Sequence, residues 1–83
     1  MNDIIKKIVK EKQELESKIF NLKAFIDSLD YPIHETTSEE LQYIGAMIEQ
    51  LRVMEQYSEI LTKRISLLNN NDMSYFKERE RIE

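Results

Sequence analysis

Hydrophobic residues recur along the first third of the chain at alternating spacings of three and four. The series runs Ile5, Ile8, Lys12, Leu15, Ile19, Leu22, Ile26 and Leu29. This alternation is the heptad pattern of a helix that packs one stripe against another helix, and Lys12 is its single interruption. The pattern predicts a helix over about residues 3–29, capped by Asn2 or Asp3. Pro32 favours an end just before it, because proline disfavours helical geometry in the preceding residue.

A second series of the same kind follows in the other half of the chain. It runs Ile44, Met47, Leu51, Met54, Ser58, Leu61, Ile65 and Leu68, with Ser58 as its single interruption. Thr36 or Thr37 should begin this helix, because each is followed three residues later by a glutamate, the spacing of a capping box. The run of Asn and Asp at 69–72 should end it, since these side chains bond to nearby backbone and tolerate left-handed geometry. The expected helix spans about residues 38–69.

A short connection over residues 30–37 makes the two helices antiparallel neighbours. The two seams then match layer by layer, as Ile5 with Ile65, Lys12 with Ser58, Ile19 with Leu51, and Ile26 with Ile44. Both interruptions fall in one polar layer, which supports the hairpin and its register. The expected fold is all-α, an antiparallel, coiled-coil-like two-helix hairpin in residues 1–72. Residues 73–83 are expected to form a short helix capped by Ser74 or a flexible tail.

Many apolar residues lie off the two seams, where a lone hairpin would leave them in water. They are Ile4, Val9, Phe20, Phe25, Leu41, Tyr43, Ile48, Val53, Tyr57 and Ile60. So many on a two-helix object indicate a second buried surface. With 83 residues and no cysteine, the chain has neither a large core nor disulfides to stabilise it. We therefore expect a homo-oligomer, most simply a dimeric four-helix bundle, with higher symmetric assemblies as the alternative.

Composition narrows the range of partners and locations. The formal net charge of −4 argues against a protein that coats DNA or RNA. No apolar run approaches the ~20 residues that a membrane span needs. The N-terminal residues also lack the apolar segment of a signal peptide. We expect a cytosolic protein with no membrane association.

The sequence offers little material for catalysis or metal binding. Its one histidine, His34, falls in the connection, far from Ser58 in any hairpin. Gly45 alone cannot build a glycine-rich phosphate loop. Its presence within a helix reflects either a close approach between protomers or a neutral substitution. Without cysteine or a His–carboxylate cluster, we expect no metal, no other cofactor and no enzymatic activity.

A stripe of polar and aromatic residues runs beside the hydrophobic series of the second helix at seven-residue spacing. It holds Tyr43, Gln50, Tyr57 and Arg64. In the expected register it faces the first helix, with Phe25 opposite Tyr43, Lys18 opposite Gln50, Glu11 opposite Tyr57, and Ile4 opposite Arg64. The simpler interpretation is a hairpin flank made of an aromatic pair, two hydrogen bonds and an arginine stem over an isoleucine. The other is a ligand surface, in which tyrosines stack on a base, Arg64 and Lys18 bind phosphate, and Gln50 reads a polar edge.

The opposite flank brings two carboxylates together. Glu16 and Glu55 face each other there, close to Lys23. Because like charges repel, we expect a basic group from another protomer or a partner to lie between them.

Two stretches carry a resemblance to known proteins. They are EKxxLxxKIxxLxxFI, which begins at Glu11, and QxxxMxxYxxILxxRI, which begins at Gln50. Over roughly residues 8–66 the chain resembles a widespread family of small phage-encoded helical proteins named after a gene of a crAss-like phage. The connection and the tail from Asn69 depart from that family. The family has no settled activity, but other phage hairpins of this size assemble into oligomers and sequester the nucleotide signals of bacterial immunity.

The resemblance and the stripe together favour one hypothesis. It is a non-enzymatic, homo-oligomeric phage counter-defence protein that acts in the host cytoplasm and sequesters a cyclic or otherwise modified nucleotide. Its expected ligand-binding residues are Lys18, Tyr43, Gln50, Tyr57 and Arg64. The main alternative is a protein–protein interaction module, a helical bundle that inhibits a host or phage protein. A structural or assembly protein of the phage particle is a third.

Overall fold

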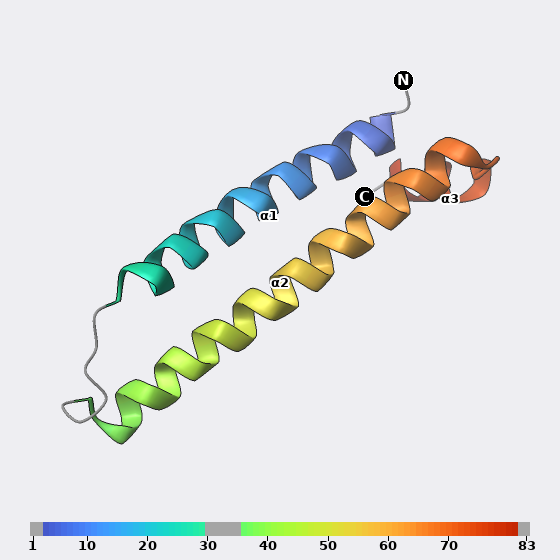
Figure 1. Cartoon of the computed structure of the whole chain (residues 1–83). Helices are drawn as coiled ribbons and strands as arrows, with labels where there is room; N and C mark the ends of the chain where they lie inside the picture. The colour runs from blue at the N-terminus through green and yellow to red at the C-terminus, as the bar shows by residue number, and fades with distance from the viewer. Residues whose placement is uncertain (1–2, 30–35, 82–83) are drawn as a thin grey trace.

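The computed structural model describes residues 3–29 and 36–81 of the chain, and within them it contains three helices. Helix α1 spans Asp3–Ser28, α2 spans Ser38–Asn70 and α3 spans Ser74–Arg81. Figure 1 shows α1 and α2 side by side and antiparallel, with α3 at the end where the N-terminus lies. The predicted all-α hairpin with a short C-terminal helix is therefore confirmed. The expected connection, with His34, falls mainly in residues 30–35, outside the described residues.

Helix α2 begins with the predicted capping box. The Thr37 side-chain oxygen accepts a hydrogen bond from the Glu40 backbone N–H (3.1 Å), and the Glu40 carboxylate accepts one from the Thr37 backbone N–H (3.3 Å). Two N–H groups that a helix start leaves without partners are satisfied in this way. Of the two threonines expected to begin the helix, Thr37 is the cap.

The asparagine run ends α2, but without left-handed geometry. Asn71 has φ −134° and ψ 158°, so the chain leaves the helix in an extended conformation. No described residue has a positive φ. The Asn71 side-chain amide donates to the Leu67 carbonyl (3.1 Å), which satisfies one of the last acceptors of the helix.

Asp72, two residues before the start of α3, accepts hydrogen bonds from the first helical residue, Ser74. The Asp72 carboxylate accepts from the Ser74 hydroxyl (2.5 Å) and from the Ser74 backbone N–H (3.3 Å). These two hydrogen bonds, that of the hydroxyl foremost, favour the charged carboxylate and hold the pKa of Asp72 below its ordinary value. The expected cap is wrong because Ser74 is already the first helical residue and acts as a donor.

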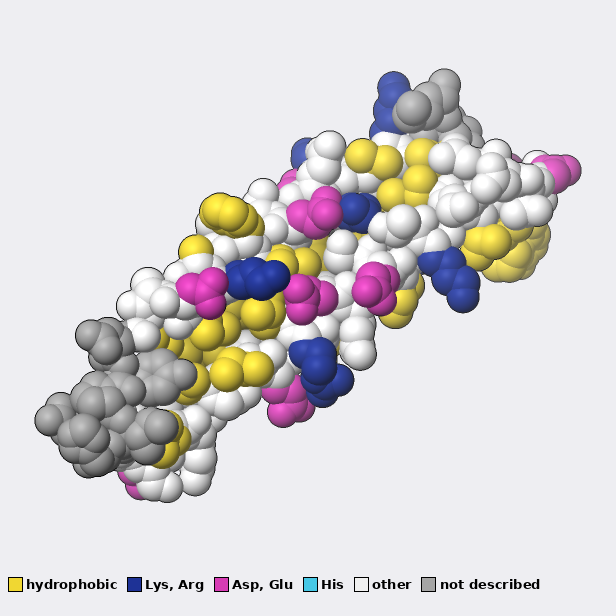
Figure 2. Space-filling view, viewed as in Figure 1, with side chains coloured by type: hydrophobic (Ala, Val, Ile, Leu, Met, Phe, Trp, Pro, Cys, Tyr) yellow, Lys and Arg dark blue, Asp and Glu magenta, His cyan; other side chains and the backbone are white. Residues whose placement is uncertain are grey.

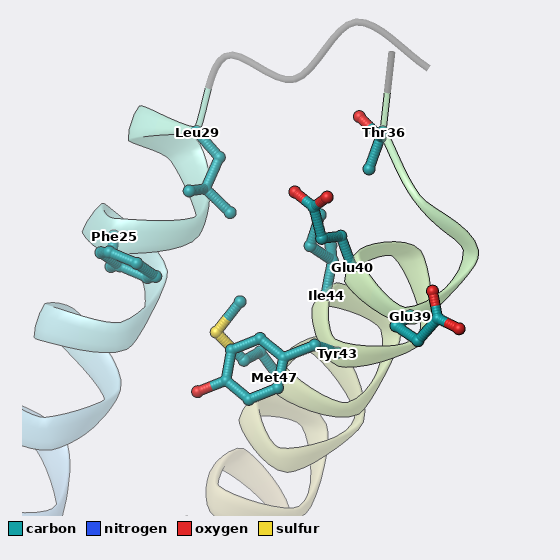
Figure 3. A pocket seen from close by; sticks show the side chains of 8 residues that line it. All are labelled: Phe25, Leu29, Thr36, Glu39, Glu40, Tyr43, Ile44 and Met47. Atoms are coloured by element: carbon teal, nitrogen blue, oxygen red, sulfur yellow. The ribbon is translucent and has the colours of Figure 1, made fainter. Parts of the chain in front are cut away.

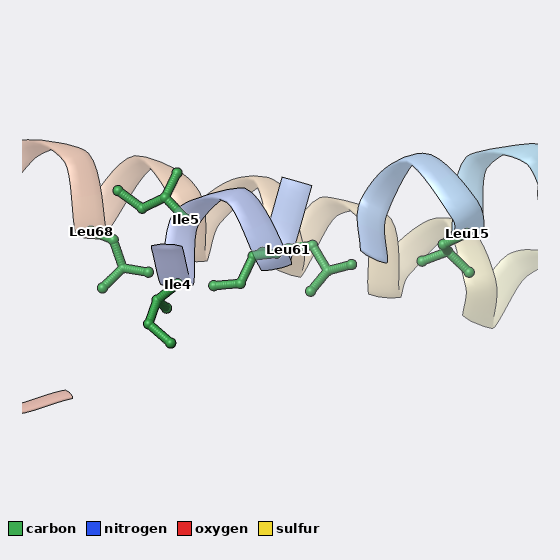
Figure 4. Packing of buried hydrophobic residues seen from close by; sticks show 6 residues of the cluster. Ile4, Ile5, Leu15, Leu61 and Leu68 are labelled. Atoms are coloured by element: carbon green, nitrogen blue, oxygen red, sulfur yellow. The ribbon is translucent and has the colours of Figure 1, made fainter. Parts of the chain in front are cut away.

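The buried core lies at one end of the hairpin. Figure 4 shows this cluster, which consists of Ile4, Ile5, Ile8, Leu15, Leu61 and Leu68. Leu61 is completely buried. Ile4 was expected off the seam among the solvent-facing residues, yet it is only 3% exposed. Helix α3 contacts α1 at this end and Met73 packs against the cluster, so the C-terminal segment covers a flank that two helices alone would leave open.

The two interruptions of the seams remain partly buried, as expected for a polar layer. Ser58 is half-buried, and the Lys12 side chain retains 24% exposure. The Lys12 ammonium pairs with the carboxylate of Glu16, one turn further along the same helix, at 3.1 Å. Lysine can therefore occupy the seam because its stem packs there while its charge reaches solvent and a partner.

The molecule is a rod with extents of 57 × 21 × 18 Å. Its accessible surface is 6653 Å² for a mass of 10.0 kDa. A compact monomer of that mass exposes about 5,200 Å². The hairpin thus keeps an unusually large share of its surface in water.

Candidate ligand-binding surface

On the flank beside the hydrophobic series of α2 that packs on α1, one hydrogen bond joins the two helices. Tyr57 on α2 donates its phenolic hydroxyl to the carboxylate of Glu11 on α1. This is a pair that the heptad register predicted. The stripe of Tyr43, Gln50, Tyr57 and Arg64 accordingly runs along the edge of α2 that borders α1.

A cavity of about 490 Å³ lies at one end of this stripe, between the end of α1 and the start of α2 (Figure 3). Its lining residues are Phe25, Leu29, Thr36, Glu39, Glu40, Tyr43, Ile44 and Met47. Phe25 and Tyr43, which were predicted to face each other, both line this cavity, one from each helix, and each residue is more than half exposed. The volume is within the range of small-molecule sites, and aromatic walls suit a planar ring.

The charges around this cavity matter for its ligand. Its described lining includes the carboxylates of Glu39 and Glu40 but no lysine or arginine. Glu40 is already engaged in the capping box. A flat apolar group fits these walls, but an attached phosphate would need a cation from elsewhere.

Arg64 lies far from this cavity within the protomer. It lines a smaller hollow of about 140 Å³ with Leu67, Leu68, Met73 and Phe76, next to α3. At ~1.5 Å per residue, Tyr43 and Arg64 are roughly 30 Å apart along α2. One small ligand cannot touch both within one hairpin.

The other two expected ligand residues lie between these ends. Lys18 and Gln50 are both exposed. The Gln50 amide is 3.8 Å from the Met54 sulfur, one turn away. The structure therefore places all five expected residues along the same flank without bringing them into one cavity.

Most apolar residues expected outside the hairpin seam are indeed exposed. Figure 2 shows hydrophobic side chains at intervals along one face of the rod, interrupted by acidic and basic ones. The exposed large residues are Phe20, Phe25, Leu41, Tyr43, Ile48, Val53, Tyr57, Ile60, Leu67, Tyr75 and Phe76. Leu67, Tyr75 and Phe76 were not anticipated. Leu67 falls on the outer face of α2, and the heptad count could have found it.

On the opposite flank, which contains Glu16 and Glu55, the expected basic group from another molecule is not needed. Lys23 pairs with Glu55 at 3.7 Å, and Lys12 pairs with Glu16 at 3.1 Å. Both carboxylates are thus balanced by lysines of the same chain. This flank gives no reason to invoke a cation from a second molecule.

No group of three or more His, Cys, Asp or Glu among the described residues could hold a metal ion. None of the described helices is long and apolar enough to cross a membrane.

The fold and its cavity define a small helical hairpin that offers an apolar, aromatic-walled site, the equipment of a binding protein. The chain belongs to the Sequestin family, whose model matches residues 2–67. The match covers both sequence stretches noted above and stops short of α3. The family name denotes sequestration, which suggests a protein that binds rather than catalyses. Neither curated proteins nor solved structures yielded a match.

Proposed function

We propose that the protein is a phage-encoded counter-defence factor that sequesters a nucleotide-type immune signal in the cytoplasm of a bacterial host. It acts as a homo-oligomer and by stoichiometric binding, without catalysis. The observation that carries this proposal is the cavity lined by Phe25 and Tyr43 in a member of the Sequestin family. A nucleotide has a planar base and a charged phosphate, and the flank offers a group for each.

The base belongs at the aromatic end of the flank. Tyr43 lines the cavity and can stack on the base, which contributes roughly 1–3 kcal/mol per base in single-strand binders. Tyr57 lies roughly 21 Å further along α2 and can stack only on a second ring. Gln50, between them, supplies a donor and an acceptor for a base edge.

The phosphate belongs with the cations of the same flank. Arg64 can bind it through two parallel N–H donors, and Lys18 as a point charge. Because the described lining of the cavity holds carboxylates and no cation, at least one of these two residues must be brought to it for tight binding.

Native mass spectrometry of protein purified under mild conditions from cells with active immune signalling tests the proposal. We expect an oligomer that carries an additional mass on the order of a nucleotide per site, released on denaturation. Arg64→Ala should lose this mass while circular dichroism shows unchanged helicity. Arg52→Ala, an exposed arginine on another face of α2, is the matched control and should keep it. A clean oligomer under these conditions, or full loading of Arg64→Ala, would contradict the assignment.

A protein–protein interaction module is the second candidate, favoured by exposed apolar residues away from the stripe. Phe20 on α1 is 72% exposed and does not line the cavity. Large exposed aromatic residues are typical anchors of protein interfaces. If Phe20→Ser abolishes counter-defence activity and leaves nucleotide loading intact, a protein partner is the target.

A further inference from the structure

Helix α2 carries a second heptad seam, which takes in the edge that borders α1 and the exposed face next to it. The second seam consists of Tyr43, Ala46, Gln50, Val53, Tyr57, Ile60, Arg64 and Leu67. Spacings of three and four alternate throughout, as in the seam that packs on α1. Its members are exposed, except for half-buried Arg64. At ~100° per residue its centre lies roughly a right angle around α2 from the contact with α1, which is where a further helix of a bundle packs.

The corresponding face of α1 lacks such a seam. The positions equivalent to the apolar half of the second seam are Lys7, Glu14, Asn21 and Ser28, all exposed. A helical partner is therefore expected on α2 and not on α1.

The second seam is complementary to itself when two copies run antiparallel about a two-fold axis level with Glu55, beside Gln56. The layers are then Tyr43 with Leu67, Ala46 with Arg64, Gln50 with Ile60, and Val53 with Tyr57, each between one copy and the other. Each layer pairs one residue from each of the two alternating positions of the seam. A parallel pair would instead set Arg64 against Arg64 of the partner subunit, with like charges in contact.

The residues beside the second seam support the antiparallel pairing. In this register Glu49 faces Lys63 of the partner subunit, and symmetry repeats the pair on the other side of the axis. Gln56 meets Gln56 of the partner subunit. Neither Glu49 nor Lys63 forms an ion pair with another described residue of its own chain. Flanking charges of opposite sign are the feature that sets partner and orientation in helical pairs.

We propose that a second copy of this chain docks antiparallel on the second seam of α2, and that its Arg64 completes the cavity lined by Phe25 and Tyr43. The composite site rests on the proposed function and assigns its ligand class as a nucleotide. The base stacks at Tyr43, and the phosphate binds Arg64 of the partner subunit. Two identical sites result, one at each end of the dimer.

The antiparallel pairing brings Arg64 of the partner subunit close to Tyr43, although the two residues are far apart within one hairpin. Arg64 of the partner subunit lies opposite Ala46, the smallest side chain of the second seam. Ala46 is one turn from Tyr43 and adjacent to Met47, which both line the cavity. A distance of roughly 30 Å within the chain becomes about one helical turn between chains. The cation that the described lining lacks is thus supplied by the second copy.

The area available suits a dimer. The chain exposes 6653 Å², which is roughly 1,400 Å² more than a compact monomer of its mass. A stable interface of standard size buries about 800 Å² on each partner. A second copy on this face would remove more than half of that excess exposed area per chain.

Engineered cysteines test the assembly. The chain has no cysteine of its own, so only the introduced residue can react with a crosslinker. Gln56→Cys should crosslink efficiently to itself with a short bismaleimide, since this position lies next to the axis on the flank of the interface. Gln42→Cys is the matched control on the same edge of α2, and its two copies would be about 40 Å apart. Crosslinking of both variants would mean a parallel pair, and crosslinking of neither would mean no pairing through α2. Either result overturns the proposal.

Mixed dimers test the composite site. Tyr43→Ala and Arg64→Ala, co-expressed with different tags and purified through both, form dimers with one intact site. We measure binding of cyclic AMP and cyclic di-AMP and the mass of any co-purified nucleotide. The mixed dimer should regain half of the wild-type stoichiometry, whereas each variant alone regains none. No recovery, with wild-type protein loaded, overturns the composite site. If wild-type protein binds no nucleotide although Gln56→Cys crosslinks, the proposed function and the composite site fail while the antiparallel pairing stands.

Discussion

Tyr57 and Glu11 lie 46 positions apart in the chain, and the hydroxyl of the first donates to the carboxylate of the second across the hairpin. This contact fixes the register of α1 against α2 outside the apolar seam. It also immobilises a tyrosine ring on the flank to which we assign ligand binding.

Tyr57→Phe removes this hydrogen bond and keeps the ring. Because both residues are exposed, we expect the free energy of unfolding to fall by no more than about 1 kcal/mol. Urea denaturation of Tyr57→Phe, Glu11→Gln and the double variant measures the coupling between the two residues. Additive effects would show that the hydrogen bond contributes nothing. Tyr57→Phe should retain nucleotide loading, since stacking needs the ring and not the hydroxyl.

Leu61→Ala tests the buried cluster. Leu61 is fully buried, so truncation leaves a cavity and should lower the free energy of unfolding by about 2–5 kcal/mol. That is a large part of the stability of a small domain, and thermal unfolding followed by circular dichroism should shift strongly. Glu59→Ala, exposed on the same helix, is the control and should unfold near the wild-type temperature. Equal unfolding temperatures for the two variants would contradict the core described above.

Gly45→Ala should stabilise the protein. Apart from its own helical neighbourhood, no heavy atom of the described residues lies within 4 Å of the position that an alanine Cβ would take. Alanine exceeds glycine in helix propensity by about 1 kcal/mol, so the free energy of unfolding should rise by up to that amount. Gly45 lies outside the second seam, and sedimentation should show an unchanged oligomer. A dissociated Gly45→Ala would instead indicate a close approach between protomers at this glycine.

The start of α3 should respond to acid. The pKa of Asp72 is lower in the folded chain because the Ser74 hydroxyl and N–H favour its charged form. This contribution is complete above the unfolded-state pKa and is lost as the pH falls through the lower folded-state value. NMR of the Ser74 and Lys77 amides during acid titration should therefore show α3 fraying in the acidic range. Asp72→Asn keeps an acceptor without a charge, and these amides should then lose that acid transition.

Local patterns predicted much of this structure. Heptad spacing and a capping box gave both long helices and their register, because each depends on residues within one or two turns. The same register predicted that Phe25 and Tyr43 face each other across the hairpin, and both line the cavity. Ile4 is buried more completely than the predicted cover by the Arg64 stem implied, and α3 also packs against α1 at this end. The role of Asp72 was missed because a short helix can start at neighbouring positions with nearly equal local preference.

The seven-residue stripe did not predict a single binding site, for a geometric reason. Seven-residue spacing places Tyr43 and Arg64 on one face but says nothing of their separation along the axis. Glu16 and Glu55 were correctly placed on one flank, yet Lys12 and Lys23 reach them from neighbouring turns. Long flexible side chains choose among several partners, and a one-dimensional pattern does not rank them.

The uneven burial along the rod implies uneven local stability. The buried cluster occupies the end near α3, whereas Met47 is the one buried residue among those described toward the connection. Amide hydrogens near Leu61 should then exchange with solvent deuterium only through global unfolding, and those near Phe25 and Tyr43 through frequent local opening. The cavity thus lies in the half of the hairpin whose helices separate most readily. A ligand could enter the cavity there while the end near α3 stays folded. Its binding would slow deuterium uptake in the half that contains the cavity and not in the other.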